Sequence, residues 1–269
     1  MTESLRKRIL TAAVLAAALL CVLLLLPPVA TVIVVSLIVL LGAWEWSAFL
    51  RLPSAALRAA YVGLIGLLMF AAWSVSVTAG AGNFVMQLAL AWWCVALLWV
   101  TLAPRRVAGW SAALAGVLAL VPAWLALIRL RVGLADGAQW VLFALLLVWV
   151  ADIGAFFCGR HFGRVRLAPQ VSPAKTWEGV LGGMLLSAVC ALAGAAWFRL
   201  PALPFLLLCL AAVGFSVVGD LTESLLKRFA GVKDSGTLFP GHGGVMDRID
   251  SLTAAAPVLF FGLGLLGVV

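Results

Sequence analysis

The sequence predicts an all-α, polytopic integral membrane protein, and three observations support this fold class. Of the 269 residues, 65% are hydrophobic and only 10% are charged, whereas a soluble domain has about half apolar and about a quarter charged residues. Apolar runs of about 20 residues, the length that spans a bilayer, recur along the whole chain. The charged residues gather between these runs. A lipid bilayer is therefore the solvent that we expect around most of the chain.

The apolar runs predict about nine transmembrane helices. Their expected ranges are 9–26, 28–50, 57–79, 84–102, 108–130, 137–158, 178–198, 203–226 and 250–268. Only Pro27-Pro28 separates the first two runs. Because proline ends one helix and can start the next, a single long kinked helix is the alternative. The first run follows Arg6, Lys7 and Arg8 and has no small-residue cleavage site after it, so we expect an uncleaved anchor.

The basic side chains predict a cytoplasmic N-terminus. In that orientation fifteen of the 18 lysine and arginine residues fall on the cytoplasmic side, and only Arg129, Arg131 and Arg199 fall opposite. This bias follows the positive-inside rule, and an odd number of spans then puts the C-terminus outside. Topology, together with the polar site, thus accounts for most of the net charge of +8, and the placement of the charges argues against a nucleic-acid partner.

We expect one integral-membrane domain, residues 1–269, with two unlike halves. Residues 1–135 have short connections and few polar spans, as in a scaffold that faces lipid. Residues 136–269 contain two polar segments, about 159–177 and 227–249, and loops longer than about 12–15 residues are usually functional or disordered. Acids in spanning helices are costly and indicate function. They fall in this second half at Asp152, Asp220, Glu223, Asp247 and Asp250.

Glu45 is the exception, because it lies in the first half of the chain. It stands between Trp44 and Trp46 in an apolar run. We interpret it as a buried hydrogen-bonding residue rather than as a ligand.

The stretch "GDLTESLLKR" places polar side chains on one face of its helix. Asp220, Glu223, Ser224 and Lys227 have the spacing i, i+3, i+4, i+7, which brings side chains together on a helix surface. The rest of that helix is apolar. The pattern indicates either a binding site or an internal salt-bridge network.

The stretch "MDRID" repeats this arrangement at the start of the last helix, where Asp247 and Asp250 are one turn apart. A glycine-rich loop joins the two helices, so up to four carboxylates are expected to meet. Carboxylates without histidine or cysteine are hard oxygen ligands that suit magnesium, above all together with phosphate. The basic residues expected around them are Lys227, Arg228, Lys233 and Arg248.

Two further stretches are suited to anions. "GHGG" contributes Gly243 and Gly244 after His242, and glycine lets backbone N–H groups approach an anion closely. "SPAKTWEG" contributes Ser172, Lys175 and Thr176 just before a helix, where the helix N-terminus favours negative charge.

Residues 224–250, "SLLKRFAGVKDSGTLFPGHGGVMDRID", resemble the signature of the phosphatidate cytidylyltransferases, or CDP-diacylglycerol synthases. The matching pattern is Ser-x-x-Lys-Arg, Lys-Asp, Pro-x-His-Gly-Gly and Asp-Arg-x-Asp at fixed spacing. "VWVADIGAFFCGRHFG" and "SPAKTWEG" resemble two further family segments. Ala174 and Ala151 depart from the family, which often has a lysine and a hydroxyl residue there.

The resemblance implies transfer of a cytidylyl group from CTP to phosphatidic acid, giving CDP-diacylglycerol and pyrophosphate, with Mg²⁺ required and K⁺ as a candidate second cation. It also implies a multi-pass protein of the bacterial inner membrane whose active site faces the cytoplasm. The expected partners are CTP, phosphatidic acid and membrane lipids, with a homodimer as an alternative to a monomer.

The resemblance also implies roles for particular residues of this chain. Asp220 and Asp247 are the first choices as metal ligands, followed by Glu223 and Asp250. The residues expected to be catalytic are Asp220, Asp247, Lys227 and Arg248. Those expected to bind substrate are Asp152, Ser172, Lys175, Thr176, Ser224, Arg228, Lys233, Asp234, His242, Gly243 and Gly244.

Two other functions fit part of the pattern. A secondary transporter also uses acids in spanning helices, but it usually has repeated halves and broken helices near the midplane, whereas here the polar residues gather towards one face. Another membrane lipid enzyme that uses CTP is the second alternative. Transport of a substrate without CTP turnover would distinguish the first from an enzyme.

Overall fold

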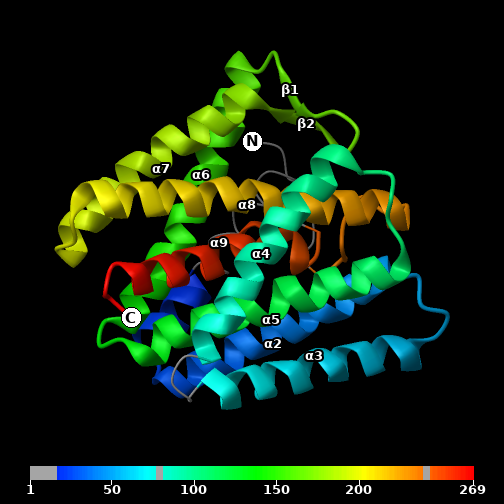
Figure 1. Cartoon of the computed structure of the whole chain (residues 1–269), viewed down its shortest axis with the longest axis horizontal. Helices are drawn as coiled ribbons and strands as arrows, with labels where there is room; N and C mark the ends of the chain where they lie inside the picture. Colours follow the sequence, from blue (N-terminus) through cyan, green and yellow to red (C-terminus); the bar gives the residue numbers. More distant parts are fainter. Residues whose placement is uncertain (1–16, 77–80, 239–242) are drawn as a thin grey trace.

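A computed structural model describes residues 17–76, 81–238 and 243–269, and within them eight helices are long and apolar enough to cross a membrane. They are α2 (Pro28–Phe49), α3 (Ala55–Ser76), α4 (Ala81–Leu102), α5 (Gly109–Gly133), α6 (Gly137–Phe162), α7 (Trp177–Phe198), α8 (Ala202–Ala230) and α9 (Met246–Leu265). Their order confirms the predicted all-α, polytopic class (Figure 1).

The predicted first helix lies partly outside the described residues, so the total of nine stays a prediction. Its described part is helical at residues 17–24, and α2 begins at Pro28 with Pro27 as its N-cap. The proline pair thus separates two helices rather than kinking one, because neither proline has a backbone N–H to continue the helical hydrogen bonds.

A small antiparallel hairpin lies between α6 and α7, where we predicted only a loop. Strand β1 is Arg166–Ala168 and strand β2 is Ser172–Thr176, with Ala168 opposite Ser172. Three to five residues with a proline give too short a pattern for a strand prediction. The polar backbone here emerges from the helices, and pairing with itself satisfies its hydrogen-bonding groups.

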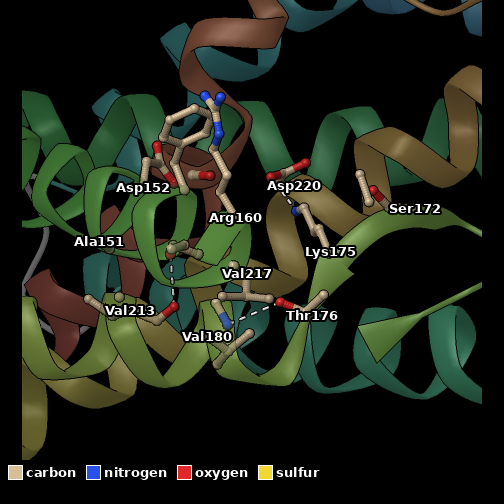
Figure 2. A pocket seen from close by; sticks show the side chains of 18 residues that line it. Ala151, Asp152, Arg160, Ser172, Lys175, Thr176, Val180, Val213, Val217 and Asp220 are labelled. Atoms are coloured by element: carbon tan, nitrogen blue, oxygen red, sulfur yellow. Dashed lines mark hydrogen bonds and ion pairs between the residues drawn. The ribbon is translucent and has the colours of Figure 1, made fainter. Parts of the chain in front are cut away.

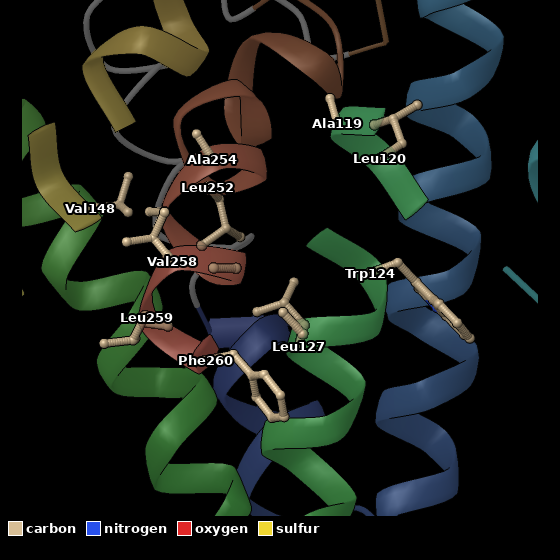
Figure 3. Packing of buried hydrophobic residues seen from close by; sticks show 14 of the residues in the cluster. Ala119, Leu120, Trp124, Leu127, Val148, Leu252, Ala254, Val258, Leu259 and Phe260 are labelled. Carbon is tan, nitrogen blue, oxygen red and sulfur yellow. The ribbon is translucent and has the colours of Figure 1, made fainter. Parts of the chain in front are cut away.

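The core is built around α5 and α9. In their most apolar stretches 72% and 67% of the residues are buried, compared with 17% in α3. Helix α9 lies among α4, α5 and α8 (Figure 1). In the close view, Leu252 and Val258 of α9 face the same interior as Leu127 of α5 (Figure 3). The helix that starts with Asp247 is therefore held in the middle of the molecule.

The described parts of both long polar segments lie at one end of the bundle, which we call the polar end (residues 50–55, 103–108, 163–176, 231–238 and 243–245). The guanidinium of Arg51, after α2, donates a hydrogen bond to the carbonyl of Phe229 near the end of α8. Arg228 Nε donates to the carbonyl of Val171 in the hairpin, 3.4 Å away. The expected placement of the two segments on one face is therefore confirmed.

Candidate functional site

A cleft of about 550 Å³ opens at the polar end between α6, α7, α8 and the hairpin. Its walls combine valines, alanines and glycines with a polar group of side chains. The charged and hydroxyl-bearing residues of the lining are Asp152, Arg160, Ser172, Lys175, Thr176, Ser216, Asp220 and Ser251. The cleft can therefore hold a molecule with both an apolar part and an anionic part.

Lys175 and Asp220 form an ion pair across the cleft. Lys175 comes from β2 and Asp220 from α8, and Figure 2 shows the ammonium reaching the carboxylate. Their side chains are 25% and 29% exposed. The Ser224 hydroxyl also lies 3.4 Å from Asp220 Oδ1, one turn further along α8. The pair is open to solvent and to any ligand in the cleft.

The hairpin is attached firmly to the start of α7. Thr176 is the N-cap of this helix, and its hydroxyl oxygen accepts a hydrogen bond from the N–H of Gly179 at 3.2 Å, the favoured arrangement for such a cap. Glu178 accepts a hydrogen bond from the N–H of Val165, with both carboxylate oxygens 3.2 Å from that nitrogen. These contacts fix β2 and thereby direct Lys175 into the cleft.

A second lysine joins α8 to α9. Lys227 Nζ lies 2.7 Å from Glu223 Oε2, one turn earlier on α8, and 2.7 Å from Asp247 Oδ1 in the first turn of α9. The side chains are 14%, 1% and 10% exposed for Lys227, Glu223 and Asp247. The salt-bridge network that we considered as an alternative is therefore present here, while Asp220 pairs with the hairpin instead.

The described parts of the loop between α8 and α9, residues 231–238 and 243–245, contact Asp247. Its Oδ2 accepts hydrogen bonds from the N–H groups of Ser235 at 3.0 Å and Gly244 at 2.8 Å, and the Ser235 hydroxyl lies 3.0 Å away. Gly243 has a positive φ of 77°, a conformation that favours glycine. Gly243 thus turns the chain so that the next N–H group, that of Gly244, faces a carboxylate.

Glu45 contacts the same loop from α2. It is 9% exposed and accepts hydrogen bonds from the Ser235 hydroxyl and from the N–H groups of Val245 and Met246. The interpretation of Glu45 as a buried hydrogen-bonding residue is confirmed.

The predicted site residues thus fall into three groups. The cleft gathers Asp152, Ser172, Lys175, Thr176 and Asp220, to which Ser224 is bonded. The network at the start of α9 gathers Glu223, Lys227, Asp247 and Gly244, next to Gly243. The remaining predicted residues with described positions, none of which lines the cleft, are Arg228, Lys233, Asp234, Arg248 and Asp250.

Asp250 and Arg248 lie near these groups. Asp250 Oδ1 accepts a hydrogen bond from the N–H of Ser251, which lines the cleft, at 2.7 Å, and Arg248 follows Asp247 in the first turn of α9. Lys233 and Asp234 are exposed on the loop. The prediction for His242 falls outside the described residues.

The sequence analysis missed several residues of the site. Ser216 and Arg160 line the cleft, and Ser251 closes it from α9. Ser216 lies one turn before Asp220 on α8, so its helical spacing was an available signal. Ser235 was missed because its neighbours Lys233 and Asp234 carry the charges of the loop, whereas an isolated serine has no distinctive pattern.

The described residues contain no group of three or more Asp, Glu, His or Cys side chains arranged to hold a metal ion. Magnesium does not need such a group, since one or two carboxylates together with substrate phosphates and waters suffice. The carboxylates of Asp220 and Asp247 have the right chemistry. Each is neutralised by a lysine in this structure.

The fold and the cleft define a multi-pass membrane protein with a charged, anion-suited site at one end of its helices. The chain belongs to the cytidylyltransferase family, whose family model matches residues 6–266. It is 44% identical to the phosphatidate cytidylyltransferase of Pseudomonas aeruginosa, over 94% of this chain and 95% of the relative. The enzyme of that name from Haemophilus influenzae is 39% identical, over 94% and 96%. The one from Bacillus subtilis is 42% identical over about half of each chain, 48% and 49%.

Proposed function

We propose that this chain transfers a cytidylyl group from CTP to phosphatidate, giving CDP-diacylglycerol and pyrophosphate. The observation that carries the proposal is the meeting, at one end of the bundle, of segment 172–176 with the described residues 220–238 and 243–250, which are far apart from it in sequence. Lys175 of the first contacts Asp220 of the second, and Arg228 of the second contacts Val171 beside the first. Family membership agrees with this reaction.

The reaction joins a phosphate oxygen of phosphatidate to the α-phosphorus of CTP, and the bond from that phosphorus to pyrophosphate breaks. The attacking oxygen is already anionic at neutral pH, so a general base is not required. The site must instead bring two anions together and neutralise them. Lys175, Lys227 and Arg248 are the proposed side chains for this role, and Arg228 and Lys233 are further candidates.

We propose that Asp220 and Asp247 hold Mg²⁺, with Glu223 and Asp250 as additional candidates. A bound Mg²⁺ would neutralise phosphate charge during the transfer. In the structure Asp220 and Asp247 form ion pairs with Lys175 and Lys227, respectively. When a cation and phosphates enter together, the acids can exchange these lysines for the cation, and the lysines can turn to the phosphates. Asp152 is the candidate for a second cation such as K⁺.

The cleft also supports a lipid substrate. Val180, Val213 and Val217 line it beside the charged residues, and Phe156 at its edge is 57% exposed. An apolar wall next to anion-binding groups is suited to a lipid phosphate that arrives from the bilayer. Ser172 and its neighbours in the "SPAKTWEG" stretch are proposed to contact the phosphates of CTP.

We further propose that the protein resides in the bacterial inner membrane with the polar end in the cytoplasm. The excess of basic residues at this end supports this orientation. Single cysteines at Gln170 and Leu238 should escape a membrane-impermeant thiol reagent in intact cells and react after permeabilisation. Efficient labelling of intact cells would reverse the orientation.

The reaction is tested with purified protein in detergent, radiolabelled CTP and a panel of phospholipids. We expect pyrophosphate release and labelled lipid only when phosphatidate and Mg²⁺ are both present. Labelling of a different acceptor would indicate another CTP-using lipid enzyme. Ion-coupled uptake into liposomes without CTP turnover would support a transporter.

A further inference from the structure

Glu45 joins the first half of the chain to the loop between α8 and α9. Its Oε1 accepts a hydrogen bond from the N–H of Val245 at 3.0 Å, and its Oε2 accepts from the N–H of Met246 at 2.9 Å and from the Ser235 hydroxyl at 2.8 Å. These partners lie 190 to 201 residues further along the chain. Both carboxylate oxygens are therefore committed to the loop and to the start of α9.

The carboxylate supplies a cap that α9 lacks locally. The first N–H groups of a helix have no partner within the helix, and Val245 at the N-cap contributes no side-chain hydrogen bond. An anion is stabilised at this position by the helix dipole. Glu45 thus fixes the point at which α9 begins, and Asp247 lies in the first turn after that point.

Two glycines make this contact sterically feasible. A Cβ atom at Gly236 or at Gly244 would overlap the Glu45 carboxylate. The loop can pack against the acid only because these two positions carry no side chain. Gly244 therefore has a role in the "GHGG" stretch that does not involve a substrate anion.

Ser235 connects Glu45 to Asp247. Its hydroxyl oxygen lies 2.8 Å from Glu45 Oε2 and 3.0 Å from Asp247 Oδ2, and its N–H donates to Asp247. A hydroxyl has one proton to donate, so it serves one carboxylate at a time and stands between the two. Asp247 in turn forms an ion pair with Lys227, so polar contacts connect α2 to α8 without interruption.

We propose that Glu45 is a positioning residue of the cytidylyl-transfer site, an inference that rests on the proposed function. It sets the first turn of α9 and the loop at Ser235, and through them the orientation of the Asp247 carboxylate, without touching substrate. The first half of the chain, which the sequence indicates as a scaffold, then contributes directly to the geometry of the site.

The test compares Glu45→Gln with Tyr61→Phe. The glutamine keeps the volume but places an amide NH₂ group against backbone N–H donors, because only one of its two terminal atoms can accept. Tyr61→Phe removes another buried interhelical hydrogen bond, from the Tyr61 hydroxyl to the carbonyl of Ala113 at 3.0 Å, away from the loop. It controls for a general loss of packing.

We expect Glu45→Gln to lower kcat by about 10- to 100-fold, the range for residues that orient a metal ligand, with a higher Mg²⁺ concentration at half-maximal rate. Tyr61→Phe should leave both unchanged. Hydrogen–deuterium exchange gives a readout independent of turnover. The amides of residues 243–250 should exchange faster in Glu45→Gln and at the wild-type rate in Tyr61→Phe.

Wild-type kcat and wild-type exchange in Glu45→Gln would overturn the inference, as would equal losses in both variants. If Glu45→Gln does not fold, Ser235→Ala decides: it keeps the Glu45 hydrogen bonds to the N–H groups of Val245 and Met246. It removes the connecting hydroxyl, which also accepts from the N–H of Asp247 at 3.3 Å, so kcat per folded molecule should fall. An inactive wild-type protein would refute the proposed function instead, and the exchange comparison would still test Glu45.

Discussion

The site contains two lysines that neutralise acids, and the two differ in their surroundings. Lys175 meets Asp220 across the cleft, where both side chains are about a quarter exposed, at 25% and 29%. Lys227 lies between Glu223 and Asp247, where the acids are 1% and 10% exposed. A screened, open ion pair contributes little to stability, whereas a buried one cannot lose a partner without leaving an uncompensated charge.

The comparison indicates a division of roles. The Lys175 pair connects a hairpin to a helix, and we propose that it opens when a ligand enters and serves binding. The Lys227 triad connects two central helices and holds them in register. Asp247 and Lys227 belong to both sets, since they form part of the buried triad and are also proposed to hold the metal and to neutralise phosphate, respectively.

Exchanging each aspartate for asparagine is the strongest test of this division. Asp220→Asn and Asp247→Asn should each lower activity by at least about 100-fold, the scale for losing one electrostatic contact to the transition state. The melting temperature should stay near wild type for Asp220→Asn and fall for Asp247→Asn, whose carboxylate is buried among donors. Activity and thermal unfolding are measured in the same detergent preparation.

The double variant sharpens this test. If both acids share one metal, its activity should be close to that of the worse single variant, because the metal is lost only once. Asp136→Asn is the matched control, since Asp136 is an exposed acid before α6 at the opposite end. Strictly multiplicative losses would separate the two acids into independent roles.

Replacing each lysine should show that Lys227 contributes mainly to stability and Lys175 mainly to activity. Lys227→Met leaves Glu223 buried and unpaired, and should cost about 3–5 kcal/mol in the free energy of unfolding. Lys175→Met should cost at most about 1 kcal/mol and still lower the rate per folded molecule. Denaturant titration gives the first quantity and the CTP assay gives the second.

Lys227→Met with Glu223→Gln supplies the matching control. Neutralising the glutamate removes the uncompensated charge, so the double variant should recover part of the lost stability. A Lys227→Met protein that is as stable as the wild type would contradict the assignment of this triad to structure.

Hydropathy was sufficient to predict the membrane fold. Eight of the expected spans appear among the described helices, because twenty apolar residues have only one way to satisfy their backbone in lipid. The hairpin was not predictable. Its strands are three and five residues long, and their pairing depends on where α6 ends and α7 begins rather than on a pattern in the strands.

The sequence was sufficient to predict which residues belong to the site, but not which residues most of them contact. Helical spacing placed Glu223 with Lys227 and Ser224 with Asp220 correctly, since these contacts are local. The Lys175 to Asp220 pair and the Glu45 to Ser235 contact join segments far apart in sequence. Periodicity contains no information on such contacts, because they depend on how the helices pack.

The smallest expected effect is at Thr176, beside the exposed Lys175–Asp220 pair. Its substitution distinguishes a residue that only caps α7 from one that also contacts substrate. Its hydroxyl oxygen caps α7 through the N–H of Gly179, while its side chain also lines the cleft beside Lys175. Thr176→Ala should cost about 1 kcal/mol, as is typical for the loss of a cap, and should reduce activity only a few-fold by loosening β2. Thr176→Ser keeps the acceptor oxygen and should retain both wild-type stability and wild-type turnover. Denaturant midpoints and the Michaelis constant for CTP are measured for the two variants side by side. A serine variant with normal stability and a raised Michaelis constant would show that this position contacts substrate and does more than hold the hairpin to α7.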